Sequence, residues 1–152
     1  MSFLSSLNIA GSGLTAQKKR LDVIAENITN RETLRTEDGG PYRRKLSVFE
    51  EIPHSGGRNF AGFLRATRFT QGTGGTKGGV RVVEIIEDQS DFIPVYDPTH
   101  PDADQEGYVM MPNVDTTVEM VDAMAANRSF SASLATFEAI KTMARQSLEI
   151  GR

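Results

Sequence analysis

Cysteine is absent from this sequence of 152 residues, and only two histidines occur. Without cysteine the chain can form neither disulfides nor thiolate metal sites, and it has no cysteine nucleophile. No apolar run approaches the roughly 20 residues that a membrane-spanning helix needs. The formal net charge is −3 without a dominant basic block, so binding driven by nucleic-acid phosphates is not expected. Neither nucleic-acid binding nor direct membrane insertion is therefore among the expected functions.

The first residues also lack the features of a Sec signal peptide. Residues 1–11 (MSFLSSLNIAG) contain neither a basic segment nor an unbroken apolar core, and such peptides have both. If this protein leaves the cytoplasm, it is expected to use another export route.

The N-terminal stretch has apolar residues at heptad spacing. One set recurs every seven residues and a second fills the companion positions: Leu7, Leu14, Leu21 and Ile28, with Phe3, Ala10, polar Gln17 and Ile24. This spacing predicts a helix from about residue 3 to residues 27–30, with an apolar seam along it. Gly11 and Gly13 are expected to permit close helix approach or a local bend. Asn30 is expected to end the helix as a left-handed cap.

The C-terminal stretch predicts a longer helix, which neither glycine nor proline interrupts up to about residue 150. Thr116 and Glu119 have the spacing of a capping box, with Asp115 as the alternative cap. A single partner helix can cover only one apolar row, so other copies or related subunits are expected to cover the remaining rows. The methionines of the third row suit either an adaptable binding surface or ordinary core. The three rows are Val118, Val121, Ala125, Ala132, Ala135 and Ala139; Phe130, Leu134, Phe137, Ala144 and Leu148; and Met120, Met124, Ile140 and Met143.

Short strand signals lie between the two helical stretches. Residues 42–52 and the β-branched run 80–86 are predicted strands. Residues 60–69 predict a weaker strand or hairpin, and residues 108–111 an extended piece. The glycine-rich run 72–79 is expected to connect them flexibly.

The predicted fold class is therefore α+β. Long N- and C-terminal α-helices are expected to pair as a coiled coil, with a small glycine-rich β region in the middle. The expected domains are the helices at 1–30 and 115–152, which form one helical domain, and a connector with the small β region at 31–114.

No motif in the sequence builds a catalytic or ligand-binding site. Lys77 in the glycine run resembles a phosphate-binding lysine, but Gly78 follows it where serine or threonine is required. Residues 102–107 resemble the start of a calcium-binding loop, but Asn113 stands where the bidentate glutamate belongs. His100 and the second histidine occupy separate loops and make a poor metal shell. We expect no catalytic residue, no metal and no cofactor.

Several segments resemble one known family. Residues 25–30 (AENITN) are similar to the asparagine-bearing motif of the bacterial flagellar rod and hook axial proteins. Glu26 departs from the usual residue of this motif. Further segments resemble the signatures of the family's proximal-rod members, with Phe130 in place of the usual residue. These segments are 33–44 (TLRTEDGGPYRR), 95–104 (VYDPTHPDAD), 106–114 (EGYVMMPNV), 119–122 (EMVD), 126–130 (ANRSF) and 148–151 (LEIG).

The resemblance implies a structural subunit of the proximal rod, located in the periplasmic part of the flagellar basal body. The terminal helices would form an inner coiled-coil domain around a narrow export channel, within a hollow driveshaft that transmits motor torque. Export by the flagellar type III apparatus is implied, which fits the missing Sec signal. Implied partners are further copies of the chain, rod proteins B and F, the distal rod protein and hook–basal-body protein E, with the MS-ring as a further contact.

The residues expected to form the seams within and between subunits come from both helices. They are Leu7, Leu14, Leu21, Ile24, Asn27, Ile28, Asn30, Val118, Val121, Ala125, Phe130, Leu134 and Phe137. Two other functions remain open from the residues alone. One is a free-standing helical adaptor with a small β lobe, which should stay monomeric. The other is an enzyme of cell-wall turnover, which needs two placed carboxylates or a metal site.

Overall fold

The computed structural model describes residues 3–37, 39–52 and 78–150 of the chain. Two long helices and two small antiparallel sheets confirm the predicted α+β class. The strand signal at 60–69, His54 and Lys77 lie outside the described residues. The elements are α1 (Phe3–Thr29), β1 (Lys45–Glu51), β2 (Val80–Glu87), β3 (Ile93–Tyr96), β4 (Tyr108–Met111) and α3 (Thr116–Ile150).

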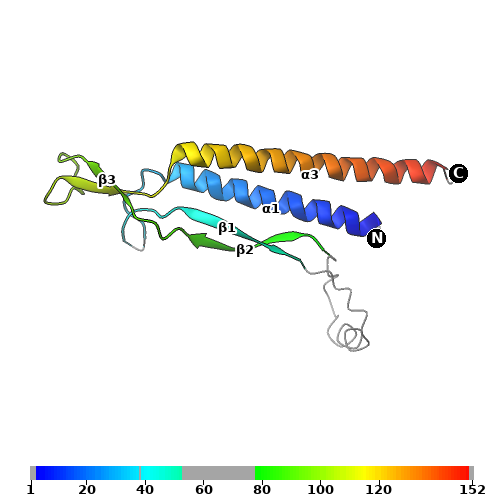
Figure 1. Ribbon diagram of the computed structural model, residues 1–152, viewed down its shortest axis with the longest axis horizontal. Coiled ribbons are helices and arrows are strands. Elements are labelled where there is room, and N and C mark those ends of the chain that lie inside the picture. Colours follow the sequence, from blue (N-terminus) through cyan, green and yellow to red (C-terminus); the bar gives the residue numbers. More distant parts are fainter. Residues whose placement is uncertain (1–2, 38, 53–77, 151–152) are drawn as a thin grey trace, which may run out of the picture.

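The two helices run antiparallel and lie side by side (Figure 1). α1 has 27 residues and α3 has 35, which corresponds to roughly 40 and 50 Å at about 1.5 Å per residue. The first turn of α1 and the last turn of α3 lie at the same end of the molecule. A Cβ atom added to Gly13 would lie 3.3 Å from Ser133 Oγ, whereas nothing lies within 4 Å of one added to Gly11. Close helix approach is thus confirmed at Gly13 but not at Gly11.

The apolar core of the helix pair is narrow. Ala16, Val23 and Ile24 of α1 and Ala126 of α3 are buried, and Ala126 has no exposed surface. The small side chains of Ala16 and Ala126 let the two backbones approach each other closely. Gln17 is less well accommodated, because its buried Oε1 has no hydrogen-bond partner within the described segments.

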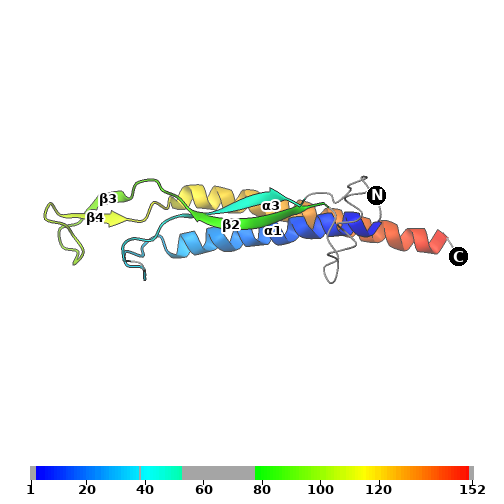
Figure 2. The same cartoon turned by 90° about the horizontal axis from the view of Figure 1, so that it is seen from below.

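Strands β1 and β2 form a hairpin-like ladder that packs against α1 (Figure 2). The pairing runs from Lys45↔Glu87 to Glu51↔Val80, with a bulge after Val48. The ladder is attached to α1 where Val80 N donates to Ser12 Oγ at 3.1 Å. No strand of the described segments lies against α3. The helix pair is therefore covered by β-structure on the α1 side.

Strands β3 and β4 form a separate two-stranded sheet at the end of the molecule far from the chain termini (Figure 1). We call this element the distal hairpin. β4 confirms the extended piece predicted at 108–111, but β3 was not predicted because Pro94 interrupts its pattern. A two-stranded sheet accepts proline, since both of its strands are edge strands. The Tyr96 and Tyr108 rings pack edge to face, 5.3 Å apart.

Both predicted helix ends need correction. α3 is capped by the alternative residue Asp115, whose Oδ1 accepts from Thr117 N at 2.8 Å, while the Glu119 side chain turns away into the interior. Asn30 does not adopt a left-handed conformation, since among the described residues only glycines have positive φ. Its N–H instead continues the helical pattern by donating to Glu26 O at 3.0 Å.

Candidate assembly surfaces and the polar junction

Asn27, the asparagine in the family-like motif, joins α1 to the start of β1. Its Nδ2 donates to Lys45 O at 2.9 Å, and its Oδ1 accepts from Lys45 N at 2.9 Å. Oδ1 also accepts from the Tyr42 hydroxyl at 2.9 Å, and Nδ2 reaches Glu119 Oε2 at 3.1 Å. The residue is only 1% exposed. Its amide thus fixes the strand backbone on the helix, as a neighbouring strand would.

Glu119 continues this cluster into α3. Its side chain is 1% exposed, and Oε1 accepts from Arg44 Nε at 2.6 Å. Arg44 also pairs with Asp122 at 3.2 Å, and Asp122 pairs with Arg20 of α1 at 3.2 Å. Arg20 of α1 and Asp122 of α3 therefore form an ion pair between the two helices. We call Arg20, Asn27, Tyr42, Arg44, Lys45, Glu119 and Asp122 the polar junction.

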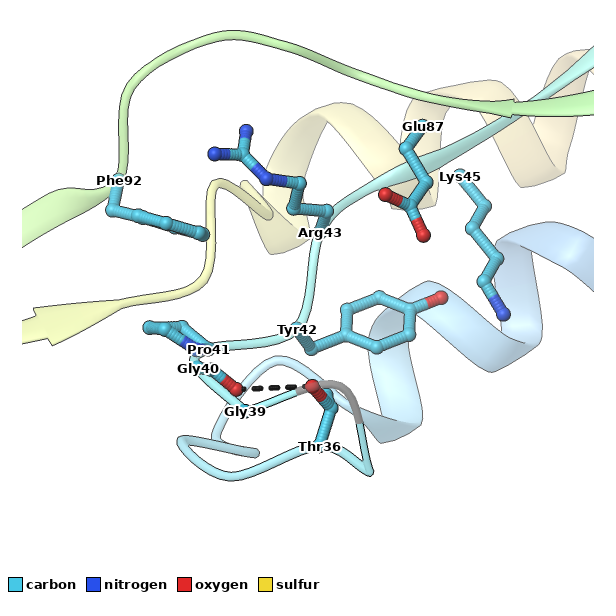
Figure 3. Close-up of a pocket in the computed structure, with 9 residues that line it drawn as sticks. All are labelled: Thr36, Gly39, Gly40, Pro41, Tyr42, Arg43, Lys45, Glu87 and Phe92. Atoms are coloured by element: carbon cyan, nitrogen blue, oxygen red, sulfur yellow. Dashed lines mark hydrogen bonds between the residues drawn. The ribbon is translucent and has the colours of Figure 1, made fainter.

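The phenol of Tyr42 is held neutral by its surroundings. Burial raises the pKa of Tyr42 well above its usual 10.0, and the carboxylates of Glu26, Glu119 and Glu87 raise it further. Figure 3 shows the ring extending toward Lys45, with Glu87 on the same side. A neutral hydroxyl is the form required here, because it donates to Asn27 Oδ1.

This pKa shift predicts a steeper loss of stability at alkaline pH. The unfolded state releases the phenol proton near pH 10 and the folded state does so only at higher pH. The contribution of the neutral Tyr42 phenol to the free energy of unfolding is therefore complete below about pH 10. Above that pH it decreases, by at most about 1.4 kcal/mol per pH unit. Urea unfolding between about pH 8 and pH 11 should give a shallower pH dependence for Tyr42→Phe than for the wild type. Tyr96→Phe, in the exposed distal hairpin, is the control; equal slopes in all three proteins would contradict the prediction.

A depression of about 330 Å³ lies beside the junction. Figure 3 shows Phe92, Arg43 and Glu87 around it, with the Thr36 hydroxyl donating to Gly40 O. Its described lining contains neither histidine nor serine. Across the described part of the chain no cluster of acidic residues and histidines could hold a metal.

The predicted seam residues fall into different environments. Ile24 and Asn27 are buried, and Leu7, Leu14, Leu21, Ile28 and Asn30 are half-buried. On α3, Phe130 and Phe137 are half-buried, whereas Val118, Val121, Ala125 and Leu134 are exposed. The periodicity did not identify Ala16, Val23 or Ala126, which are buried along with them. The buried α3 positions recur at three- and four-residue spacing but include Glu119, which a search for apolar residues alone misses.

Exposed apolar side chains gather on α3 and on the distal hairpin. Val121 and Met124 of α3 are each 62% exposed, and Tyr96 of the hairpin is 65% exposed. Other exposed apolar residues on these elements are Val118, Met120, Leu134, Met143, Leu148, Ile93, Val95, Tyr108 and Met110. No helix among the described residues is long and apolar enough to cross a membrane. Exposed apolar side chains that form a patch are typical of protein–protein contact sites.

Two family profiles match the chain, one on each helical end. The family described as "Flagella basal body rod protein" matches residues 7–33, and "Flagellar basal body rod FlgEFG protein C-terminal" matches residues 105–150. The first match covers most of α1 and the second covers β4 and α3. Together they indicate the class of flagellar basal-body rod proteins.

Relatives of full length define the family within that class. The flagellar basal-body rod protein FlgC of Bacillus subtilis (strain 168) is 42% identical over 156 residues, covering 100% of both chains. FlgC of Borreliella burgdorferi is 42% identical over 99% of this chain and 98% of its own. FlgC of Salmonella typhimurium is 40% identical over 100% of both chains. The chain therefore belongs to the FlgC family, which consists of structural proteins of the flagellar rod and not of enzymes.

Proposed function

We propose that this rod protein polymerises through its helices into a hollow tube that transmits motor torque and surrounds the export channel. The observation that carries the proposal is the exposed apolar row on α3, which begins with Val118, Val121 and Ala125. Its residues recur at heptad-like spacing, and no described strand covers it. Phe130 and Phe137, on another side of α3, are half-buried, whereas Val118, Val121 and Ala125 are exposed, so this row is free for a neighbouring subunit.

The two rows lie on different sides of α3, so the internal and external contacts do not compete. A neighbour that uses a different surface to cover the exposed row makes a heterologous contact. Such contacts build open helical assemblies when the rotation between copies does not close a ring. Fully burying one side chain such as Val118 or Val121 contributes about 1.5–3 kcal/mol. Many such contacts would have to slip together before a tube of these helices twisted.

The finer organisation is part of the same proposal. The helices of domains 1–30 and 115–152 form the inner coiled-coil layer, and region 31–114 contacts lateral neighbours on the outside. The proposed partners are further copies of the chain, rod proteins B and F, the distal rod protein, hook–basal-body protein E and the MS-ring. Export proceeds through the flagellar type III apparatus. The FlgC relatives support this setting, since their names place them in the basal-body rod.

A charge placed in the exposed row tests the proposal. Val121→Asp should leave the isolated subunit folded, because Val121 is 62% exposed. In assembly it buries an unpaired carboxylate at each repeated contact, so its incorporation should fall more than tenfold, the equivalent of about 1.4 kcal/mol or more. The measurements are swimming of a strain that carries only the variant, and the amount of variant in purified basal bodies.

The matched control is Asn127→Asp, which adds the same charge at an exposed α3 position outside the row. It should be incorporated and support swimming like the wild type. Wild-type incorporation of Val121→Asp would refute the assigned contact surface. Equal defects in both variants would show that added negative charge, rather than the row, is responsible.

A further inference from the structure

Three segments meet between the helix pair and the distal hairpin. The loop between β2 and β3 and the turn between β4 and α3 connect the two bodies, and the residues that lead into β1 are bonded to both; we call this place the neck. Extended segments without a helix or wide sheet usually behave as a hinge between two bodies. The contacts at this neck instead restrict hinge movement, because hydrogen bonds join all three segments.

Asn113 lies at the centre of the neck and bonds to both other segments. Its Oδ1 accepts from Arg44 N at 2.8 Å. Its Nδ2 donates to Asp88 O at 3.2 Å and to Ser90 Oγ at 2.9 Å. One side chain therefore holds the start of β1, the β2–β3 loop and the approach to α3 together. Pro112 and Val114, on either side of it, are buried.

Arg43 holds the same loop from the opposite direction. Its Nη1 lies 3.3 Å from both Asp88 O and Ser90 O. Its guanidinium carbon lies 4.4 Å from the centroid of the Phe92 ring, as Figure 3 shows for these two side chains. The backbone adds one more bond, from Asp88 N to Arg44 O at 2.8 Å. Asn113 Nδ2 also lies 3.4 Å from Ser90 O, so two donors from different segments share the carbonyl groups of Asp88 and Ser90.

Arg44 connects the neck to the polar junction. Its backbone N–H is bonded to Asn113, while its side chain is paired with Glu119 and Asp122 of α3. The next residue, Lys45, is bonded through its backbone to Asn27 of α1. The hydrogen-bonded path therefore runs without a break from the β2–β3 loop to both helices.

We infer that Asn113 and Arg43 are positioning residues that make the neck a rigid joint, which fixes the orientation of the distal hairpin relative to the helix pair. The consequence is mechanical: a load on the hairpin reaches both helices instead of being absorbed by a hinge. Arg35, which pairs with Asp102 of the distal loop, adds little, because its side chain is 78% exposed. The inference goes beyond the proposed assembly, since it concerns the single subunit.

Spin-label distances in the soluble subunit test the joint, and the absence of cysteine from the sequence allows clean labelling. Cysteines introduced at exposed Gln105 of the distal loop and exposed Lys141 of α3 carry the labels. The wild type should give one narrow distance distribution. Arg43→Met combined with Asn113→Ala should at least double its width, because both donors to the shared carbonyls are lost. The matched control is Arg128→Met with Asn127→Ala, an exposed pair on α3 that should leave the width unchanged.

A milder variant guards against loss of folding in the double variant. Asn113→Asp keeps the acceptor for Arg44 N but loses the donors to the β2–β3 loop, so it should widen the distribution by less, with an unchanged far-UV circular dichroism spectrum. A wild-type distribution as broad as that of the double variant overturns the inference. So does an unchanged width in both neck variants. Neither result changes the outcome expected for Val121→Asp. The experiments therefore distinguish a flexible neck from an error in the proposed assembly surface.

Discussion

Arg44→Met should lower the free energy of unfolding of the isolated subunit by about 3–5 kcal/mol. The reason is the position of its partner. The Glu119 carboxylate is 1% exposed and has two bonding partners, the Arg44 guanidinium at 2.6 Å and the Asn27 amide at 3.1 Å. Methionine fills a similar volume without charge, so the variant leaves a buried carboxylate with the amide alone. Urea unfolding followed by far-UV circular dichroism measures the loss.

Two further variants separate the buried charge from the loss of an arginine. Arg35→Met removes an arginine from an exposed pair with Asp102 and should cost less than about 1 kcal/mol. Arg44→Met combined with Glu119→Met should recover much of the lost stability, because no unpaired charge then remains in the interior. If Arg44→Met costs no more than Arg35→Met, the polar junction has no structural role.

Asn27→Leu should have an effect of similar size, for a different reason. The leucine is close in volume, but it leaves Lys45 N–H, Lys45 C=O and the Tyr42 hydroxyl without their partner. A buried polar group that loses its hydrogen bond costs about 1–3 kcal/mol, so a total of about 3–5 kcal/mol is expected once some groups find other partners. The Lys45 amide should also exchange with deuterium much faster than in the wild type, which locates the damage at the helix–strand contact.

Asn8→Leu provides the comparison, because Asn8 is exposed on the same helix. This change should alter the unfolding free energy by less than about 0.5 kcal/mol. If the Lys45 amide of Asn27→Leu exchanges with deuterium as slowly as in the wild type, other contacts hold the strand to α1. Asn27 then has no role in the polar junction.

Heptad spacing predicted the helices because their length and period are local properties of the sequence. The strand at residues 80–86 was predicted for a related reason, since β-branched residues gather there. By contrast, the short strand Ile93–Tyr96 carries a proline and four residues only, too little pattern to be distinguished from a loop. Its pairing with Tyr108–Met111 becomes visible only in the folded structure.

Periodicity did not determine which apolar row meets which surface. The row of Phe130 and Phe137 and the row of Val118 and Val121 have similar spacing, so either could have faced α1. In the structure Phe130 and Phe137 are half-buried and Ala126 is completely buried, whereas Val118 and Val121 are exposed. Which row of α3 packs against α1 depends on the fit between two helices that lie far apart in the sequence. The sequence of one helix alone does not determine it.

The residue types of the polar junction did not indicate that these residues come together in the fold. Glu119 has the spacing of a capping box, and that local explanation was sufficient until Asp115 proved to be the cap. Arg44 and Tyr42 lie in a segment that reads as a turn followed by a strand. Asn27 alone was singled out in advance, through the family-like motif. The contacts of the junction are made by partners 15 to 102 residues apart, which no local pattern reports.

The antiparallel helix pair gives the subunit a head and a tail. Both chain termini belong to the tail, and the distal hairpin forms the head (Figure 1). An epitope or fluorescent protein fused to either terminus therefore obstructs the same pole, and changing from one terminus to the other gives little relief. A short epitope inserted beside Gln105 would mark the opposite pole. A pair of such labels would reveal in which direction successive subunits point along the axis of the rod.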